Sequence, residues 1–221
     1  MRLLANYMPV MKSKLVFAAL IATVLRAAPL QASDKPIDLN SIDVVDAIEC
    51  RLDAPAYNGF AFALNGEEKI ADKRSWVPMQ SENLMMNEYD LPAPITVARH
   101  YSTRRIGFTS DGVVAILDLA DTAAFAKEQK IENALDPGPL VEAMIASGKA
   151  TPEEIKEATK FSKFLGEKIV VDRTELPKDG EMFGMHTVIG RNVSNATTHP
   201  GKTFYGCSYR IEMIDKDGKP L

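Results

Sequence analysis

Cys50 and Cys207 are the two residues whose chemistry the sequence constrains most, because they are the only cysteines among 221 residues. An even number of cysteines in an oxidising compartment predicts a disulfide. This bond would join the first part of the fold to the last. The alternatives are a nucleophilic Cys207 or two free thiols.

The histidines are too widely spaced to form a metal-binding motif. They are His100, His186 and His199. Met182 and Met185 precede His186, and thioether and imidazole ligands together suit Cu(I). Methionines in such a segment also fill gaps in a core. We expect no metal or other cofactor, and these two methionines with His186 are the weak candidates for copper handling.

No motif in the chain assigns a catalytic residue. The sequence has no Gly-x-Ser-x-Gly elbow and no phosphate-binding glycine pattern. Cys207 lies eight residues after His199, but the expected disulfide would occupy its sulfur. We therefore expect a binding protein that is not an enzyme. The alternative is an envelope-associated hydrolase whose site is assembled from residues far apart in sequence.

A loop beside Cys207 combines turn-forming, aromatic and basic residues, and it reads His-Pro-Gly-Lys-Thr-Phe-Tyr-Gly from residue 199. A disulfide would order such a loop before it meets a partner, which lowers the entropy cost of binding. The candidate recognition residues are His199, Lys202, Phe204 and Tyr205. A second candidate patch consists of Tyr101, Arg104 and Arg105. The alternative reading is a hairpin turn and a strand edge.

Residues 1–32 have the layout of a cleavable signal peptide of bacterial type. Lys12 and Lys14 precede an apolar run at residues 15–25, and Ala32 is a small residue suited to cleavage before Ser33. This run is shorter than the roughly 20 apolar residues of a membrane-spanning helix. The expected mature protein is soluble, without a transmembrane segment, and exported to the periplasm or the extracellular space.

The charge balance narrows the class of partner. Removal of residues 1–32 takes four basic residues and no acidic one, so the formal net charge of −4 becomes −8. An acidic protein repels phosphate backbones, which argues against nucleic acid. We expect an envelope or extracellular protein as partner, and the oligomeric state stays open.

The first half of the chain predicts helices followed by a hairpin. Residues 42–52 have helical spacing with Cys50 in the last turn, and residues 53–66 favour a second helix begun by Asp53. Residues 65–87 read as an irregular connection. Two prolines place residues 87–99 in an edge or bulged strand. Residues 105–118 predict a β-hairpin around Asp111-Gly112.

The second half returns from helices to strands. We expect helices over residues 123–130 and 140–147, and another after the Thr151-Pro-Glu-Glu capping box. Strands are expected at 168–172, 185–193 and 203–214. These elements predict one α+β domain over residues 33–221, with helices packed on a mainly antiparallel sheet and a disulfide from an N-terminal helix to the last strand.

Overall fold

The structure is a computed structural model that describes residues 37–135, 138–149, 151, 153–154 and 163–221. The described residues belong to one unit, Ile37–Leu221. The predicted signal peptide and its cleavage site lie outside them. Thr151 and Glu154 form the predicted capping box, in which each backbone N–H donates to the other residue's side chain. Most of the helix predicted after it lies outside the described residues.

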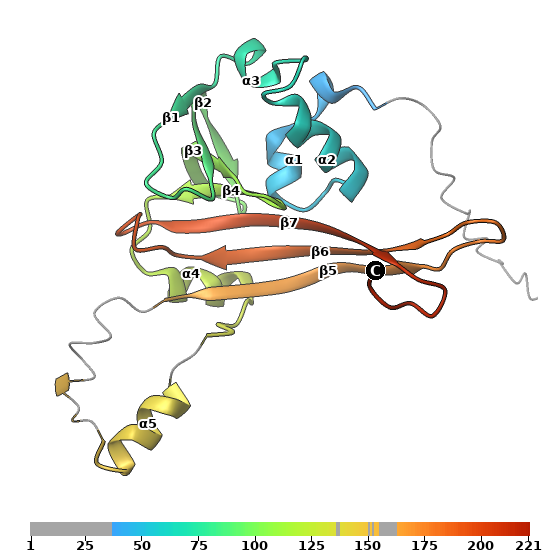
Figure 1. The fold of residues 1–221 in the computed structure, drawn as a ribbon. Coiled ribbons are helices and arrows are strands. Elements are labelled where there is room, and N and C mark those ends of the chain that lie inside the picture. The colour runs from blue at the N-terminus through green and yellow to red at the C-terminus, as the bar shows by residue number, and fades with distance from the viewer. Residues whose placement is uncertain (1–36, 136–137, 150, 152, 155–162) are drawn as a thin grey trace, which may run out of the picture. The chain divides into compact units, whose positions relative to one another are not determined.

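An antiparallel sheet of seven strands organises the described residues, which confirms the predicted α+β fold (Figure 1). The strands are β1 Val77–Met79, β2 Asn87–Val97, β3 Tyr101–Phe108, β4 Gly112–Leu117, β5 Leu165–Glu175, β6 Gly184–Ser194 and β7 Thr203–Ile214. Their order in the sheet is β1-β2-β3-β4-β7-β6-β5. The last strand in sequence therefore lies in the interior of the sheet, between β4 and β6.

Short helices accompany the sheet, and some of them contact it directly. They are η1 Leu39–Ser41, α1 Val44–Ile48, α2 Ala54–Ala63, α3 Ile70–Lys73, α4 Thr122–Gln129 and α5 Gly138–Ala146. Both α1 and α2 contact β7. Asp43, Asp53 and Asp121 cap α1, α2 and α4 by accepting a backbone N–H in the first turn. The predicted cap at Asp53 is confirmed.

Two local predictions were wrong. The helix expected over 42–52 ends at Ile48, and Cys50 follows it in a left-handed conformation with φ of 57°. Residues 65–87 are not wholly irregular, because they contain α3 and β1. β1 is only three residues long and depends on pairing with β2, a tertiary contact that local sequence does not reveal.

The two prolines in β2 coincide with an irregularity in its pairing. The register with β3 shifts between Asp90 and Ile95, the stretch that contains Pro92 and Pro94. A proline has no N–H to donate to a ladder, so it is tolerated where a strand bulges. The prediction of a bulged strand over 87–99 is confirmed.

Aromatic side chains form the centre of the core between α2 and the sheet. Phe60, Trp76, Tyr89 and Phe108 are buried, and their ring centroids lie 6.0–6.4 Å apart. Edge-to-face and tilted contacts of this kind add to the hydrophobic contribution of each ring.

The predicted disulfide is present between Cys50 and Cys207, which are 157 residues apart in sequence. A buried polar network surrounds it. Glu49 accepts hydrogen bonds from the backbone N–H of Ala98 at 2.7 Å and from the hydroxyl of Tyr205 at 2.9 Å. Burial, and next the negative charge of Glu49, raise the pKa of Tyr205 far above its usual value. The network and the disulfide together fix α1 to β7.

Gly206 marks the closest approach of two neighbouring strands. A Cβ added to this residue of β7 would lie 1.9 Å from the carbonyl oxygen of Val113 on β4. Only glycine fits at this position without moving the backbone.

Among the described residues, no helix is both long and apolar enough to cross a membrane.

Candidate functional site

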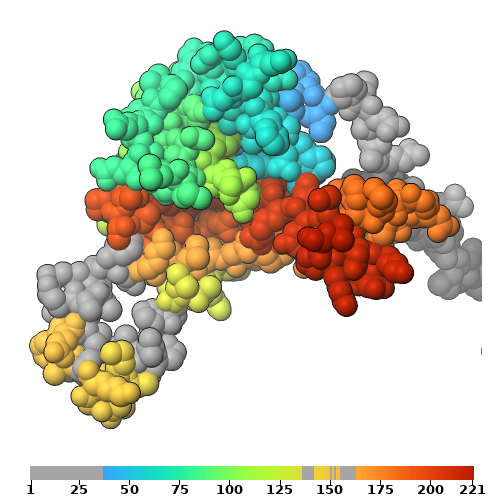
Figure 2. Space-filling model, viewed as in Figure 1, coloured from blue at the N-terminus to red at the C-terminus, as the bar shows by residue number. Residues whose placement is uncertain are grey.

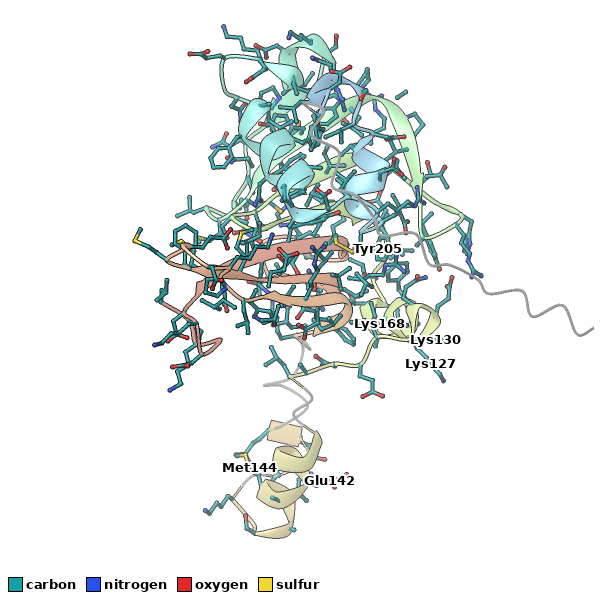
Figure 3. All side chains as sticks on the ribbon, turned by 90° about the vertical axis from the view of Figure 1, so that its right-hand side faces the viewer. Lys127, Lys130, Glu142, Met144, Lys168 and Tyr205 are labelled. Carbon is teal, nitrogen blue, oxygen red and sulfur yellow. A yellow bond between two sulfur atoms is a disulfide. The ribbon has the colours of Figure 1, made fainter. Side chains whose placement is uncertain are left out.

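The predicted recognition loop folds onto the sheet instead of projecting from it. His199 and Phe204 are buried, and Tyr205 is fully buried on β7 (Figure 3). Lys202 is the partly exposed member, and its ammonium group contacts Asp118. The structure thus brings His199 and Phe204 together, with ring centroids 5.1 Å apart, but presents little of the predicted aromatic surface to a partner.

A hydrogen-bonded chain of four side chains lies beneath this loop. His199 Nε2 is 2.9 Å from Glu88 Oε1, and His199 Nδ1 is 2.9 Å from the Thr198 hydroxyl. The other oxygen of Glu88 accepts a hydrogen bond from Arg105. The side chains of Glu88 and His199 are 1% and 7% exposed, so β2, β3 and the β6–β7 loop enclose the chain almost completely.

Two surface hollows flank His199. One, of about 330 Å³, is lined by Gln80, Glu82, Arg105, Thr198, His199, Pro200 and Lys202. The other, of about 430 Å³, is lined by Ala120, Asp121, Thr122, Ala123, Phe164, Asn195, His199, Pro200, Gly201 and Lys202. Both have room for a small molecule or for water, and Thr198 belongs to the first of them.

The second predicted patch is engaged within the protein. Arg104 donates to the carbonyl of Leu91 and to Asp90, and the Tyr101 hydroxyl donates to Glu128 at 2.6 Å. These bonds hold β3 to β2 and to α4. Tyr101 and Arg104 therefore bind other residues of the protein. Arg105 also lines the hollow beside Thr198.

The candidate copper ligands lie in a loop and on two faces of a strand, and Met182 is the one in the loop between β5 and β6. Met185 is paired with Met213 and His186 with Glu212, and neighbouring residues of a strand point to opposite faces. His186 Nε2 is instead 2.9 Å from Asp172, which raises the pKa of His186. Across the described residues, no group of three or more His, Cys, Asp or Glu side chains is placed to hold a metal ion.

The most exposed part of the sheet is its β5 edge. Within the described residues β5 pairs with β6 alone, so its other side carries backbone groups without a neighbouring strand. Every residue of β5 except Gly166 is exposed. In Figure 1 the β5–β6 ribbon runs on past α1 and α2 to the hairpin loop. Beyond Leu165 and Gly166, where the segment after α4 contacts the strand, this exposed edge is a template for a further strand.

Apolar side chains are concentrated on this ribbon. Half of the large apolar side chains exposed among the described residues belong to what we call the ribbon surface: Leu165, Ile169, Val170, Val171, Leu176, Met182, Phe183, Met185 and Met213. They are 38–88% exposed. Figure 2 shows the hairpin loop standing at the surface beside the C-terminal residues. Several of these side chains line a hollow of about 740 Å³ at the loop. Such a concentration marks an interaction surface.

A β-bulge interrupts β5 at its centre. Ile169 is paired with Gly190 and Val171 with Ile189, which leaves Val170 without a partner residue on β6. The side-chain contacts show that the bulge changes which residues of β5 lie on the same face of the sheet. Glu167 contacts Arg210, and Asp172 contacts His186, although regular alternation would put residues five apart on opposite faces.

The bulge determines which residues of β5 can meet across a new strand pair. If β5 were regular, pairing with a second copy about Val170 would set Glu167 against Arg173 and Lys168 against Asp172. The bulge moves the members of these pairs to opposite faces. Two antiparallel registers centred on the bulge place opposed side chains on the same face of the sheet. One sets Glu167 against Asp172, and the other sets Lys168 against Arg173. Like charges directly opposite each other are destabilising, so self-pairing in these two registers is disfavoured.

Most charged side chains of β5 form ion pairs within the protein, and Lys168 is the exception among the described residues. Glu167 is bound by Arg210, Asp172 by His186 and Arg173 by Glu175. Lys168 has no ion pair in the described part of the chain, and neither has Lys127 on α4 or Lys130 at the C-terminal cap of that helix. Figure 3 labels all three lysines. The segment after α4 reaches β5, because Ala134 donates to the carbonyl of Leu165.

The sequence contained a weak signal for the ribbon and none for the buried chain. The run Ile169-Val170-Val171 predicts a strand, but whether that strand lies inside a sheet or at its edge depends on the sheet order. Glu88 and His199 are 111 residues apart, and no spacing rule connects them. No protein-family model, curated protein or solved structure matches the chain.

Proposed function

We propose that the protein acts by binding another protein in the periplasm or extracellular space, and that it adds an extended segment of that partner to strand β5. The observation that carries the proposal is an 11-residue sheet edge exposed along almost its whole length. The signal-like residues 1–32 and the disulfide support a site of action outside the cytoplasm.

The backbone of β5 supplies the affinity that any extended segment could use. Its unpaired N–H and C=O groups form hydrogen bonds with an added strand, and specificity then comes from alternate side chains. Ile169 and Val171 offer apolar contacts to the two faces of the added strand, and the hollow at the hairpin loop lies farther along the same ribbon. Burial of these exposed side chains contributes about 25 cal/mol per Å².

The charges on and near β5 define the partner further. Lys168 has no ion pair within the described residues, and Lys127 and Lys130 precede the segment that reaches β5 by only a few residues. The partner segment therefore carries acidic residues where it passes Lys168. A second copy of this chain fits poorly, since the bulge sets like charges opposite each other. The partner is a different polypeptide, with acidic and apolar residues in alternation.

Site-specific photo-cross-linking in the producing cells tests the proposal. A photoreactive amino acid is placed at Ile169 or Val171 on β5 and, as a control, at Phe62 on α2. Phe62 is also apolar and highly exposed. We expect a cross-linked product with a different protein from both β5 positions and not from Phe62. Equal products from all three positions, or no product from β5, would refute binding at this edge.

Charge reversal tests the chemistry of the partner. Lys168→Glu should reduce the cross-linked product at Val171 by about fivefold, which corresponds to roughly 1 kcal/mol for a cross-strand charge pair. Lys216→Glu, in the turn after β7, is the matched control and should leave the yield unchanged. A product that consists only of two copies of this chain would contradict the choice of partner.

A further inference from the structure

The chain of side chains beneath the β6–β7 loop joins a hydroxyl, an imidazole and a carboxylate in the order that activates a nucleophile. Thr198 is half-buried and lines the hollow of about 330 Å³, while His199 and Glu88 are buried behind it. The hydroxyl-to-imidazole and imidazole-to-carboxylate distances are both 2.9 Å. A nucleophile bonded to a base that a third group orients is the general pattern of covalent catalysis.

Arg105 fixes the direction of the hydrogen bonds. It donates to one oxygen of Glu88, and a carboxylate accepts through the other oxygen as well. In the neutral imidazole, His199 Nε2 therefore carries the proton and donates it to Glu88. Nδ1 is left with its lone pair toward Thr198, and the hydroxyl donates to it. This is the tautomer that a general base needs.

We propose that this site hydrolyses small carboxylic esters, with Thr198 as nucleophile, His199 as general base and Glu88 as a positioning residue. Thr198 Oγ1 bonds to the carbonyl carbon while Nδ1 takes the hydroxyl proton. The bond to the alcohol oxygen then breaks, and the imidazolium returns that proton to the leaving alkoxide. Water deprotonated by His199 then attacks the acyl-threonine, which releases the acid and restores the hydroxyl. The net reaction consumes one ester and one water.

The hollow beside Thr198 also contains donors for the negative charge that develops on the carbonyl oxygen. Gln80, Arg105 and Lys202 line it with Thr198. The guanidinium of Arg105 already donates to Glu88, and its buried Nε has no acceptor in the described part of the structure. Donors aimed at a developing oxyanion supply a large part of the rate enhancement in acyl transfer. The volume suits a short acyl group.

The test uses p-nitrophenyl acetate with the full mature protein. We expect turnover, and an acetyl group on Thr198 located by fragmentation mass spectrometry of the acid-quenched protein. Thr198→Ala should lose both, while Thr198→Ser keeps them. Thr197→Ala is the matched control, since Thr197 is exposed and is not a member of the hydrogen-bonded chain, and it should leave both unchanged.

Glu88→Gln separates catalysis from structural support. Arg105 requires an acceptor, so the amide oxygen of the substituted side chain would turn to it and the amide N–H to His199 Nε2. The imidazole proton would move to Nδ1, and the base would be lost, with a fall in kcat of about 10⁴. Wild-type turnover no greater than that of Thr198→Ala, or acetyl groups found only on lysines, would overturn the proposal.

Discussion

Removal of the disulfide gives a large and calculable loss of stability. The bond closes a loop of 157 residues, and the chain-entropy relation gives about 17 cal/mol/K for a loop of this length, or about 5 kcal/mol at 25 °C. For a protein of this size, 1 kcal/mol corresponds to about 2–4 °C in Tm, so the loss is about 10–20 °C. The variant is Cys50→Ala with Cys207→Ala, compared with the oxidised wild type by urea unfolding.

A second double variant separates the loss of the disulfide from the cost of the left-handed backbone conformation at Cys50. This residue has φ of 57°, a conformation that costs a residue with a Cβ roughly 1 kcal/mol and glycine almost nothing. Cys50→Gly with Cys207→Ala should therefore be about 1 kcal/mol more stable than the double alanine variant. A double alanine variant within about 1 kcal/mol of the wild type would refute the entropic reasoning, as would two alkylatable thiols in the unreduced protein.

Other residues yield three further predictions. Arg210 holds the pKa of Glu167 below its usual value. This carboxylate therefore stabilises the fold above about pH 5, and its contribution is lost as the pH falls through the lowered pKa. The Tm of Glu167→Gln should fall less between about pH 6 and 3 than the Tm of the wild type. Gly206→Ala should prevent folding or lower Tm by more than about 10 °C, because its Cβ meets the Val113 carbonyl, and an unchanged urea midpoint would contradict the close approach. Burial raises the pKa of Tyr209, so ultraviolet titration of the native protein at about pH 11 should be the same for wild type and Tyr209→Phe.

Local chemistry in the sequence was sufficient for most elements of the fold. Asp53 followed by Pro55 predicts the start of α2, and the Thr151 capping box is formed as predicted. The hairpin around Asp111-Gly112 pairs β3 with β4, and its loop closes with Thr109 N–H bonded to the Gly112 carbonyl. In each case the signal and the structure lie within a few residues, so local backbone preferences decide the outcome.

Both candidate sites depend on contacts that local preferences do not contain. His199, Phe204 and Tyr205 have the composition of a recognition loop, but β7 carries Phe204 and Tyr205 into the interior of the sheet, and His199 is buried in the β6–β7 loop. Glu88 meets His199 only because β2 and the β6–β7 loop are brought together across the sheet. Whether β5 is an edge is likewise a property of the strand order and not of its own residues.

The place of β7 also sets the time at which the protein can fold. This strand follows the other six in sequence, yet it joins β4 to β6 and carries the second half of the disulfide. Until it arrives, no strand pairing joins β1–β4 to the β5–β6 hairpin. A chain synthesised from its N-terminus therefore completes its sheet only when nearly all of its residues are available, because the strand made last is the one that joins the two parts.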